Sequence, residues 1–189
     1  MKFTIGVDEA GRGPIAGPVA VGVVCVPVGF DVAKEFPGVK DSKQMTEKKR
    51  EEIFEMLSAR AVQGDVHFTV EFEDSDFIDE KGIVAAVRES AWRGIHALAP
   101  LGQVHVLLEG LLSAPPEYTH ETIIRGEHTV PIISLASVAA KVMRDRLMKD
   151  YDLQFPNYGF GKHKGYGTTA HYAALEKLGP SVIHRKTYL

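Results

Sequence analysis

The sequence predicts an α/β fold in which a mixed central β-sheet is flanked by helices and followed by a helical C-terminal part. Two observations carry this prediction. The first third of the chain contains stretches in which apolar and polar residues alternate, which is the period of β-strands. Later in the chain, a short apolar run and stretches with helical spacing follow one another, and such alternation places helices on the faces of a sheet.

The expected strands begin at the N-terminus. Phe3, Ile5 and Val7 alternate with polar or small residues up to a turn over residues 11–14, and this places Asp8 opposite the apolar face. The apolar run over residues 19–28 is expected to pair with this strand as a hairpin. Further strands are expected over residues 62–72, 104–108 and 122–124, the second of them central in the sheet.

Helical spacing predicts helices over residues 46–60, 83–98, 132–150 and 168–178. Thr46 is expected to cap the first of these, and Gly179-Pro180 to end the last. In the second helix, Trp92 and Ile95 are expected to face a core. The chain shows no repeat, low-complexity tract or linker, so residues 1–189 are expected to form a single domain.

Composition excludes several classes of protein. Cys25 is the only cysteine, which excludes a disulfide framework and a cysteine-based zinc site. No apolar run reaches the roughly 18 residues of a membrane span, and the first residues lack a signal-peptide core. We therefore expect a cytoplasmic protein that has no membrane partner. We also expect a monomer.

Charge is unevenly distributed along the chain. Residues 141–189 hold nine Lys/Arg against four Asp/Glu, whereas the remainder holds 13 against 21. A basic C-terminal quarter could follow a phosphate backbone while the acidic remainder supplies metal ligands. On charge alone, a solvated helical surface explains the pattern equally well.

The pair Asp8-Glu9 ends the first strand just before the glycine-rich turn. Adjacent carboxylates repel each other, so a fold tolerates them best in water or around a cation. Alone, such a pair more often has a surface or salt-bridge role. The glycines that follow let the backbone approach a ligand, and Arg12 between them can contact phosphate or sugar. Pro14 makes a dinucleotide-binding fingerprint a poor match.

Two further acids stand at expected element ends, Glu109 after the run 104–108 and Glu127 after Gly126. Together with Asp8 and Glu9 they could hold two Mg²⁺ ions roughly 4 Å apart. Oxygen ligands without cysteine favour Mg²⁺ or Mn²⁺. None of the eight histidines forms a His-x-x-x-His pair, which argues against a zinc hydrolase.

Two basic segments are candidates for nucleic-acid contacts. On the helix expected over residues 132–150, a polar stripe at spacings of three and four would face a phosphate backbone or, alternatively, water; it consists of Ser134, Ser137, Lys141 and Arg144. Asp145 beside it is the main rival for the fourth metal ligand, but pairing with Lys141 explains it adequately. The segment 157–167 mixes cations, aromatics and glycines without a regular period. It is expected to be a loop that grips nucleic acid or a plain surface loop.

Several motifs occur in one order along residues 5–188. They are Gly6-Val7-Asp8-Glu9-Ala10-Gly11-Arg12-Gly13-Pro14, Asp41-Ser42-Lys43, Ala139-Ala140-Lys141-Val142 with Arg144-Asp145, the run 160–168 containing Lys162-His163-Lys164-Gly165-Tyr166-Gly167, and His184-Arg185. Together and in this order, they resemble the motifs of ribonuclease HII. The resemblance implies a ribonuclease H-like fold that depends on Mg²⁺ or Mn²⁺, with two ions in the catalytic complex. It also implies hydrolysis of RNA in RNA–DNA hybrids and on the 5′ side of single ribonucleotides in duplex DNA, leaving 3′-hydroxyl and 5′-phosphate ends.

The resemblance also assigns roles to individual residues. Asp8, Glu9, Glu109 and Glu127 would be the catalytic metal ligands. Gly11, Arg12 and Gly13 would sense the ribose 2′-hydroxyl, and Tyr166 would stack on the following deoxyribose. Phosphate contacts are expected from Lys43, Ser134, Lys141 and Lys164.

Glu109 and Glu127 each replace an aspartate that is usual in this family, and each is one methylene longer. One alternative is therefore a hybrid-binding protein whose catalysis is weakened or lost through Glu109. Another is a ribonuclease HIII-like enzyme, in which we would expect lysine in place of Arg12 and an extra N-terminal domain, for which a strand starting at Lys2 leaves no room. A Mg²⁺-dependent phosphatase for small molecules would leave the basic C-terminal segment unused.

Overall fold

The computed structural model describes residues 2–99, 103–110 and 112–189. In chain order, with η marking 3₁₀-helices, its elements are β1 (Phe3–Ala10), β2 (Val19–Pro27), α1 (Val32–Glu35), η1 (Ser42–Gln44), α2 (Glu47–Gln63), β3 (His67–Glu73), α3 (Ser75–Lys81), α4 (Ile83–Leu98), β4 (Val104–Glu109), β5 (Thr119–Ile123), α5 (Gly126–Thr129), α6 (Pro131–Gln154), α7 (Phe160–His163), α8 (Thr169–Leu178) and η3 (Lys186–Tyr188). No helix in these ranges is both long and apolar enough to cross a membrane.

The five strands form one mixed sheet in the order β3-β2-β1-β4-β5. β1 pairs antiparallel with β2, as the expected hairpin requires, and β2 pairs antiparallel with β3. On its other side β1 runs parallel to β4, and β4 runs parallel to β5. The carboxyl ends of β1 and β4 therefore lie at the same edge of the sheet.

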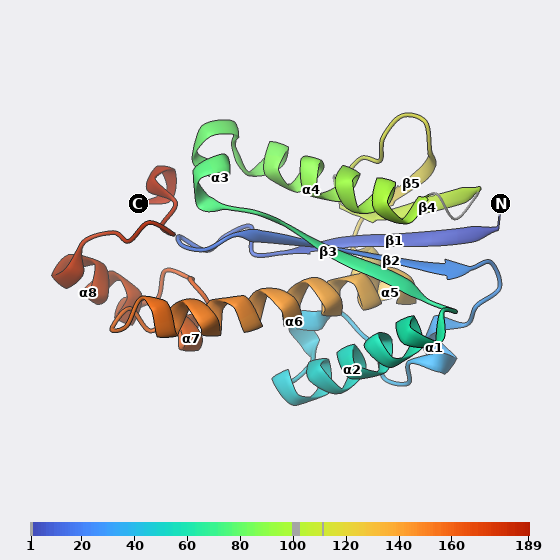
Figure 1. Ribbon diagram of the computed structural model, residues 1–189, viewed down its shortest axis with the longest axis horizontal. Coiled ribbons are helices and arrows are strands. Elements are labelled where there is room, and N and C mark those ends of the chain that lie inside the picture. The colour runs from blue at the N-terminus through green and yellow to red at the C-terminus, as the bar shows by residue number, and fades with distance from the viewer. Residues whose placement is uncertain (1, 100–102, 111) are drawn as a thin grey trace.

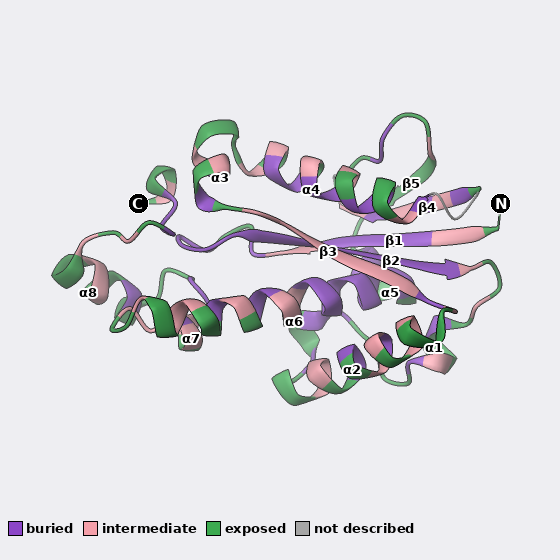
Figure 2. Ribbon diagram, viewed as in Figure 1, coloured by how far each residue is buried: buried purple, intermediate pink, exposed green. Residues whose placement is uncertain are grey.

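Helices cover both faces of the sheet (Figure 1). α3 and α4 lie on one face, whereas α6 and α2 lie on the other, and α8 with the C-terminus extends beyond one end of the sheet. Each face has its own apolar core: Ile5 and Val7 belong to the cluster under α4, and Val24 belongs to the cluster under α6. The middle of the sheet and the first half of α6 are buried as a result (Figure 2).

α6 passes unusually close to the sheet. A Cβ atom on Gly22 would lie 2.2 Å from the carbonyl oxygen of Ala136, so only glycine fits at this crossing. This close packing brings the polar residues of α6 next to the carboxyl end of β1. Ser137 consequently contacts the carboxyl group of Asp8.

Some element boundaries differ from those expected. The strand expected over 62–72 begins only at His67, because α2 continues to Gln63 with Val62 90% exposed on its last turn and Gly64 ends it in a left-handed conformation. The last strand covers Thr119–Ile123 instead of 122–124. α6 is longer at both ends than the expected 132–150, whereas α4 matches the expected 83–98.

The short helices were not expected. α1, η1, α3, α5 and α7 contain between three and seven residues, too few to show a helical period in the sequence. The segment 157–167, expected as a loop without regular structure, contains α7. Its Phe160 is fully buried, and the chain turns again after His163.

Candidate active site

Carboxylates from three elements meet at the edge where β1 and β4 end. In the parallel pairing Val7 lies beside Leu108, and both belong to the core under α4. Since side chains alternate along a strand, the next residues, Asp8 and Glu109, face the opposite side, toward α6. β5 then leads through a short turn into α5, whose second residue is Glu127.

Asp8 is buried beside Glu9. Its Oδ1 accepts a hydrogen bond from the amide N–H of Glu9 at 2.7 Å. Burial and the neighbouring charge of Glu9 raise the pKa of Asp8 well above its ordinary value, although the hydroxyl of Ser137 opposes this shift. In Glu9, Oε1 accepts from Arg12 at 3.2 Å, while Oε2 is buried and has no partner among the described residues.

Glu109 and Glu127 form a coupled pair. Both carboxylate oxygens of Glu109 accept backbone N–H groups at 3.2 Å, Oε1 from Arg125 and Oε2 from Glu127. Burial, and then the side chain of Glu127, raise the pKa of Glu109 to about 7. Burial also acts to raise the pKa of Glu127, but hydrogen bonding to Glu109 and the nearby His128 outweigh it and lower that pKa. The two carboxyl groups therefore influence each other's pKa in opposite directions.

The carboxylates gathered at this edge of the sheet fit a divalent cation. Glu9 and Glu127 each present a buried Oε2 for which the described part of the chain offers no donor. Unpartnered oxygens and raised carboxyl pKa values both indicate negative charge that lacks a counter-ion. A hard cation that prefers oxygen ligands would supply that charge.

The predicted ligand set is not the tightest one in the structure. Within the described ranges, one group of three side chains brings possible ligand atoms within 4.8 Å of one another, and it consists of Asp41, Glu127 and His128. His128 lies between the two acids, with Nδ1 3.7 Å from Asp41 Oδ2 and Nε2 3.5 Å from Glu127 Oε1. Sequence reasoning missed Asp41 and His128 as site residues, although Asp41 opens one of the recognised motifs.

A cleft of about 270 Å³ adjoins the acids. Its lining combines residues far apart in sequence: the glycine-rich turn, two lysines expected to contact phosphates and one tyrosine. The residues that line it are Glu9, Ala10, Gly11, Arg12, Gly13, Ser42, Lys43, Lys141 and Tyr166. The Tyr166 side chain is 43% exposed, so its ring is accessible to a ligand. Lys141 pairs with Asp145 at 2.7 Å, as expected from their spacing.

Three of the four residues of the expected polar stripe on α6 are buried, and the fourth, Lys141, reaches the cleft. Arg144 is fully buried, and its guanidinium donates to backbone carbonyls, so the prediction that it faces a phosphate backbone or water is wrong. Ser134 is also buried and donates to the carbonyl oxygen of Glu127 at 2.8 Å. The ammonium group of Lys164 donates to the carbonyl of Gly161. The side chains of Ser134 and Lys164 therefore support backbone segments, and neither lines the cleft.

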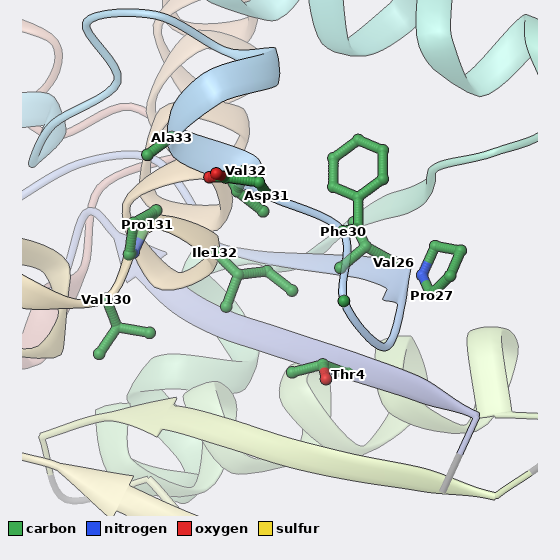
Figure 3. A pocket seen from close by; sticks show the side chains of 11 residues that line it. Thr4, Val26, Pro27, Phe30, Asp31, Val32, Ala33, Val130, Pro131 and Ile132 are labelled. Carbon is green, nitrogen blue, oxygen red and sulfur yellow. The ribbon is translucent and has the colours of Figure 1, made fainter.

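A second hollow, of about 240 Å³, lies between the start of β1, the connection from β2 to α1, and the start of α6 (Figure 3). Its lining is mainly apolar and includes Val26, Phe30 and Ile132. Its one carboxylate, Asp31, caps α1 by accepting from the amide of Lys34. None of the expected catalytic or substrate-binding residues lines this hollow, so the chemistry belongs to the cleft beside the acids.

Comparison with known proteins gives consistent matches. A sequence model of the family described as Ribonuclease HII matches residues 5–188. The Ribonuclease HII of Geotalea uraniireducens (strain Rf4) is 42% identical over 183 residues, covering 97% of this chain and 81% of the relative. The Ribonuclease HII of Leuconostoc citreum (strain KM20) is 37% identical over 188 residues, covering 100% of this chain and 68% of the relative.

Solved structures agree with the fold. Ribonuclease H2 from Pyrococcus horikoshii OT3 matches with a TM-score of 0.79 and 24% identity, covering 98% of this chain and 93% of that one. The structure described as the PCNA:RNase HII complex from Archaeoglobus fulgidus contains a chain that matches with a TM-score of 0.77 and 22% identity, covering 99% and 95%. At these identities the matches concern the fold alone, and they confirm the expected mixed sheet with flanking helices.

Proposed function

The chain belongs to the ribonuclease HII family and is thus a ribonuclease, and from this premise we propose that it hydrolyses RNA in RNA–DNA hybrids and on the 5′ side of single ribonucleotides in duplex DNA. The observation that carries the proposal is the composition of the cleft. Glu9, the turn Gly11-Arg12-Gly13 and the exposed ring of Tyr166 all line this space. An acid suited to catalysis and groups suited to a ribose therefore border the same cleft.

The family's dependence on metal agrees with the crowded acids. Asp8, Glu9, Glu109 and Glu127 would hold two ions, Mg²⁺ or Mn²⁺. When bound, such ions activate water and stabilise the charge that develops on a phosphodiester. Both carboxylate oxygens of Glu109 accept backbone amides, Oε1 from Arg125 and Oε2 from Glu127, so the longer side chain has partners within the fold.

The remaining cleft residues would bind and orient the nucleic acid. Lys43 and Lys141 would contact phosphates, and Tyr166 would stack on the deoxyribose that follows the ribonucleotide. Peptide N–H groups of the turn 11–13 would bind the 2′-hydroxyl, the group that distinguishes RNA from DNA at one nucleotide. Products would carry 3′-hydroxyl and 5′-phosphate ends. Residues 1–189 would act as one catalytic domain, as a monomer in the cytoplasm.

A cleavage assay tests this proposal. The substrate is a labelled DNA duplex with one ribonucleotide, incubated with Mg²⁺ or with Mn²⁺, and the same duplex without the ribonucleotide is the control. We expect one cut, 5′ to the ribonucleotide, and none in the control. Binding of the duplex without cleavage in either metal would overturn the proposal and favour the hybrid-binding alternative raised by Glu109.

A further inference from the structure

Arg185 is a fully buried arginine that contacts the glycine-rich turn from inside the protein. Its guanidinium donates from Nη2 to the carbonyl oxygen of Gly11 at 2.7 Å and from Nη1 to that of Arg12 at 2.8 Å. A third bond runs from Nε to the carbonyl of Gly17 at 2.9 Å. One side chain from the end of the chain thus fixes two successive peptide groups of the turn.

These bonds determine where the turn's N–H groups point. The described residues contain no cis peptide bond, and in a trans peptide the N–H points away from the C=O of the same unit. Because the carbonyls of Gly11 and Arg12 point inward to Arg185, the N–H groups of Arg12 and Gly13 point outward. Both residues line the cleft, and no acceptor for either N–H is found among the described residues.

Arg144 reinforces this arrangement from α6. Its Nε donates to the carbonyl of Pro18 at 2.8 Å and its Nη1 to that of Lys164 at 2.9 Å, which joins the turn's loop to the segment carrying Tyr166. A Cβ atom on Gly11, whose φ is +94°, would lie 2.1 Å from Arg144 Nε. The turn can therefore lie against the buried guanidinium only with glycine at position 11.

Neither arginine has a carboxylate within salt-bridge distance in the part of the chain that the structure describes. Their charge is instead balanced by carbonyl oxygens, and hydrogen bonds from a charged donor are stronger than neutral ones. A cation at the carbonyl end of a peptide also polarises that peptide, which strengthens its N–H as a donor.

We propose that Arg185 is a positioning residue for substrate selection, which aims the N–H groups of Arg12 and Gly13 at the ribose 2′-hydroxyl. The inference rests on the proposed function and adds the group that sets its specificity. A hydroxyl oxygen can accept both N–H groups, whereas a deoxyribose offers no oxygen at that position. Arg185 touches no substrate atom and acts through the backbone.

Binding measurements test the proposal. In an Asp8→Asn background, which prevents cleavage, the affinity for a duplex with one ribonucleotide is divided by that for the all-DNA duplex. Arg185→Lys keeps the charge but loses the fork of donors. We expect this ratio to fall roughly tenfold, the effect of losing one or two well-aimed hydrogen bonds.

Two controls separate positioning from general stability. Ile53→Ala removes a fully buried side chain of α2, away from the turn, and Arg88→Lys makes the same chemical change at an exposed residue of α4. Both should keep the parent's preference for the ribonucleotide. A preserved preference in Arg185→Lys would overturn the proposal. If the Asp8→Asn protein itself showed no preference for the ribonucleotide duplex, the proposed ribose-sensing function would be wrong, and this proposal with it.

Hydrogen exchange on the unaltered protein covers the case in which Arg185→Lys fails to fold. The amides of Arg12 and Gly13 should exchange quickly, because they face the cleft without an acceptor. The amides of Ile15 and Gly17, which donate to Gly165 and Ile183, should be protected. Strong protection of Arg12 and Gly13 would show that these groups point elsewhere and would overturn the proposal.

Discussion

Two regions of this protein crowd like charges together, and they differ in how those charges are satisfied. At the sheet edge, Asp8 and Glu109 have raised pKa values, and oxygens of Glu9 and Glu127 lack partners within the described ranges. Behind the glycine-rich turn, Arg144 and Arg185 are both buried, yet each guanidinium donates to three backbone carbonyls.

The difference separates a binding site from a scaffold. Buried charge whose every nitrogen donates a hydrogen bond fixes the backbone around it, because moving either partner would expose an unsatisfied group. Buried charge with unpartnered oxygens gains free energy when a counter-ion binds. The acidic region should therefore show its effects in activity and metal binding, and the arginine region in stability and specificity.

Changing Asp8 should have the largest effect. Asp8→Asn keeps the shape of the side chain but removes a ligand charge, so cleavage should fall at least about a thousandfold, or about 4 kcal/mol of transition-state stabilisation. The fold should be retained, because the substitution also relieves repulsion from Glu9. Cleavage rates and circular dichroism measure both. A fully active variant would remove Asp8 from the site and weaken the contrast.

The arginine region should respond in the opposite way. Arg144→Ala leaves several buried carbonyls without donors and should lower the free energy of unfolding by about 3 to 5 kcal/mol. Urea unfolding measures this loss, and Arg146→Ala, on an exposed residue of the same helix, should cost far less. A loss below about 1 kcal/mol in Arg144→Ala would show that these bonds are not essential to the scaffold.

The same contrast explains what sequence could predict. The acids stand at strand ends, where alternation and apolar runs locate them, and the long helices show their period directly. The partners of Arg144 and Arg185 cannot be read in this way, since the bonds from Arg144 to Pro18 and from Arg185 to Gly11 span 126 and 174 residues. A helical stripe shows which residues share a face, but not whether that face is covered.

The end of α2 and the partners of the Glu109 carboxylate could not be predicted from the sequence for a related reason. The end of α2 is set by Gly64 in a left-handed conformation, although Val62 fits a strand pattern equally well. The sequence left open whether Glu109 weakens catalysis, because its side chain is longer than that of aspartate. Only the folded turn shows that its two oxygens meet the amides of Arg125 and Glu127, which come later in the chain.

Tyr166 lies between the two regions, with its backbone in the scaffold and its ring in the cleft. His171 Nδ1 bonds to its carbonyl oxygen at 2.9 Å, while the ring is free to stack. Tyr166→Ala should reduce cleavage at a single ribonucleotide about tenfold, and less within a long RNA stretch. Tyr172→Ala, an exposed ring outside the cleft, is the control. Equal losses on both substrates would contradict a role at the junction.

The smallest expected effect concerns pH. The pKa of Glu109 is about 7 in the folded protein, against an ordinary value of 4.5. Between these values the folded state binds more protons than the unfolded one, so this group's contribution to stability is present below about pH 4.5 and is lost as the pH rises to 7. Without metal, Glu109→Gln should therefore gain stability relative to the unaltered protein over this range.

Glu109→Gln must be compared with the unaltered protein, because the stability contribution of His184 changes with pH in the opposite direction. Burial lowers the pKa of His184 to about 4, so its contribution grows between that value and its ordinary 6.5. Since both proteins contain His184, the difference between their urea midpoints cancels its contribution and reports Glu109 together with Glu127 and Asp8, whose pKa values Glu109 shifts. A saturating divalent metal should reverse the trend, because the cation binds the ionised pair and releases its proton. A difference that stays constant with pH would show that Glu109 is ionised already, and that the acidic region is as well satisfied as the arginines.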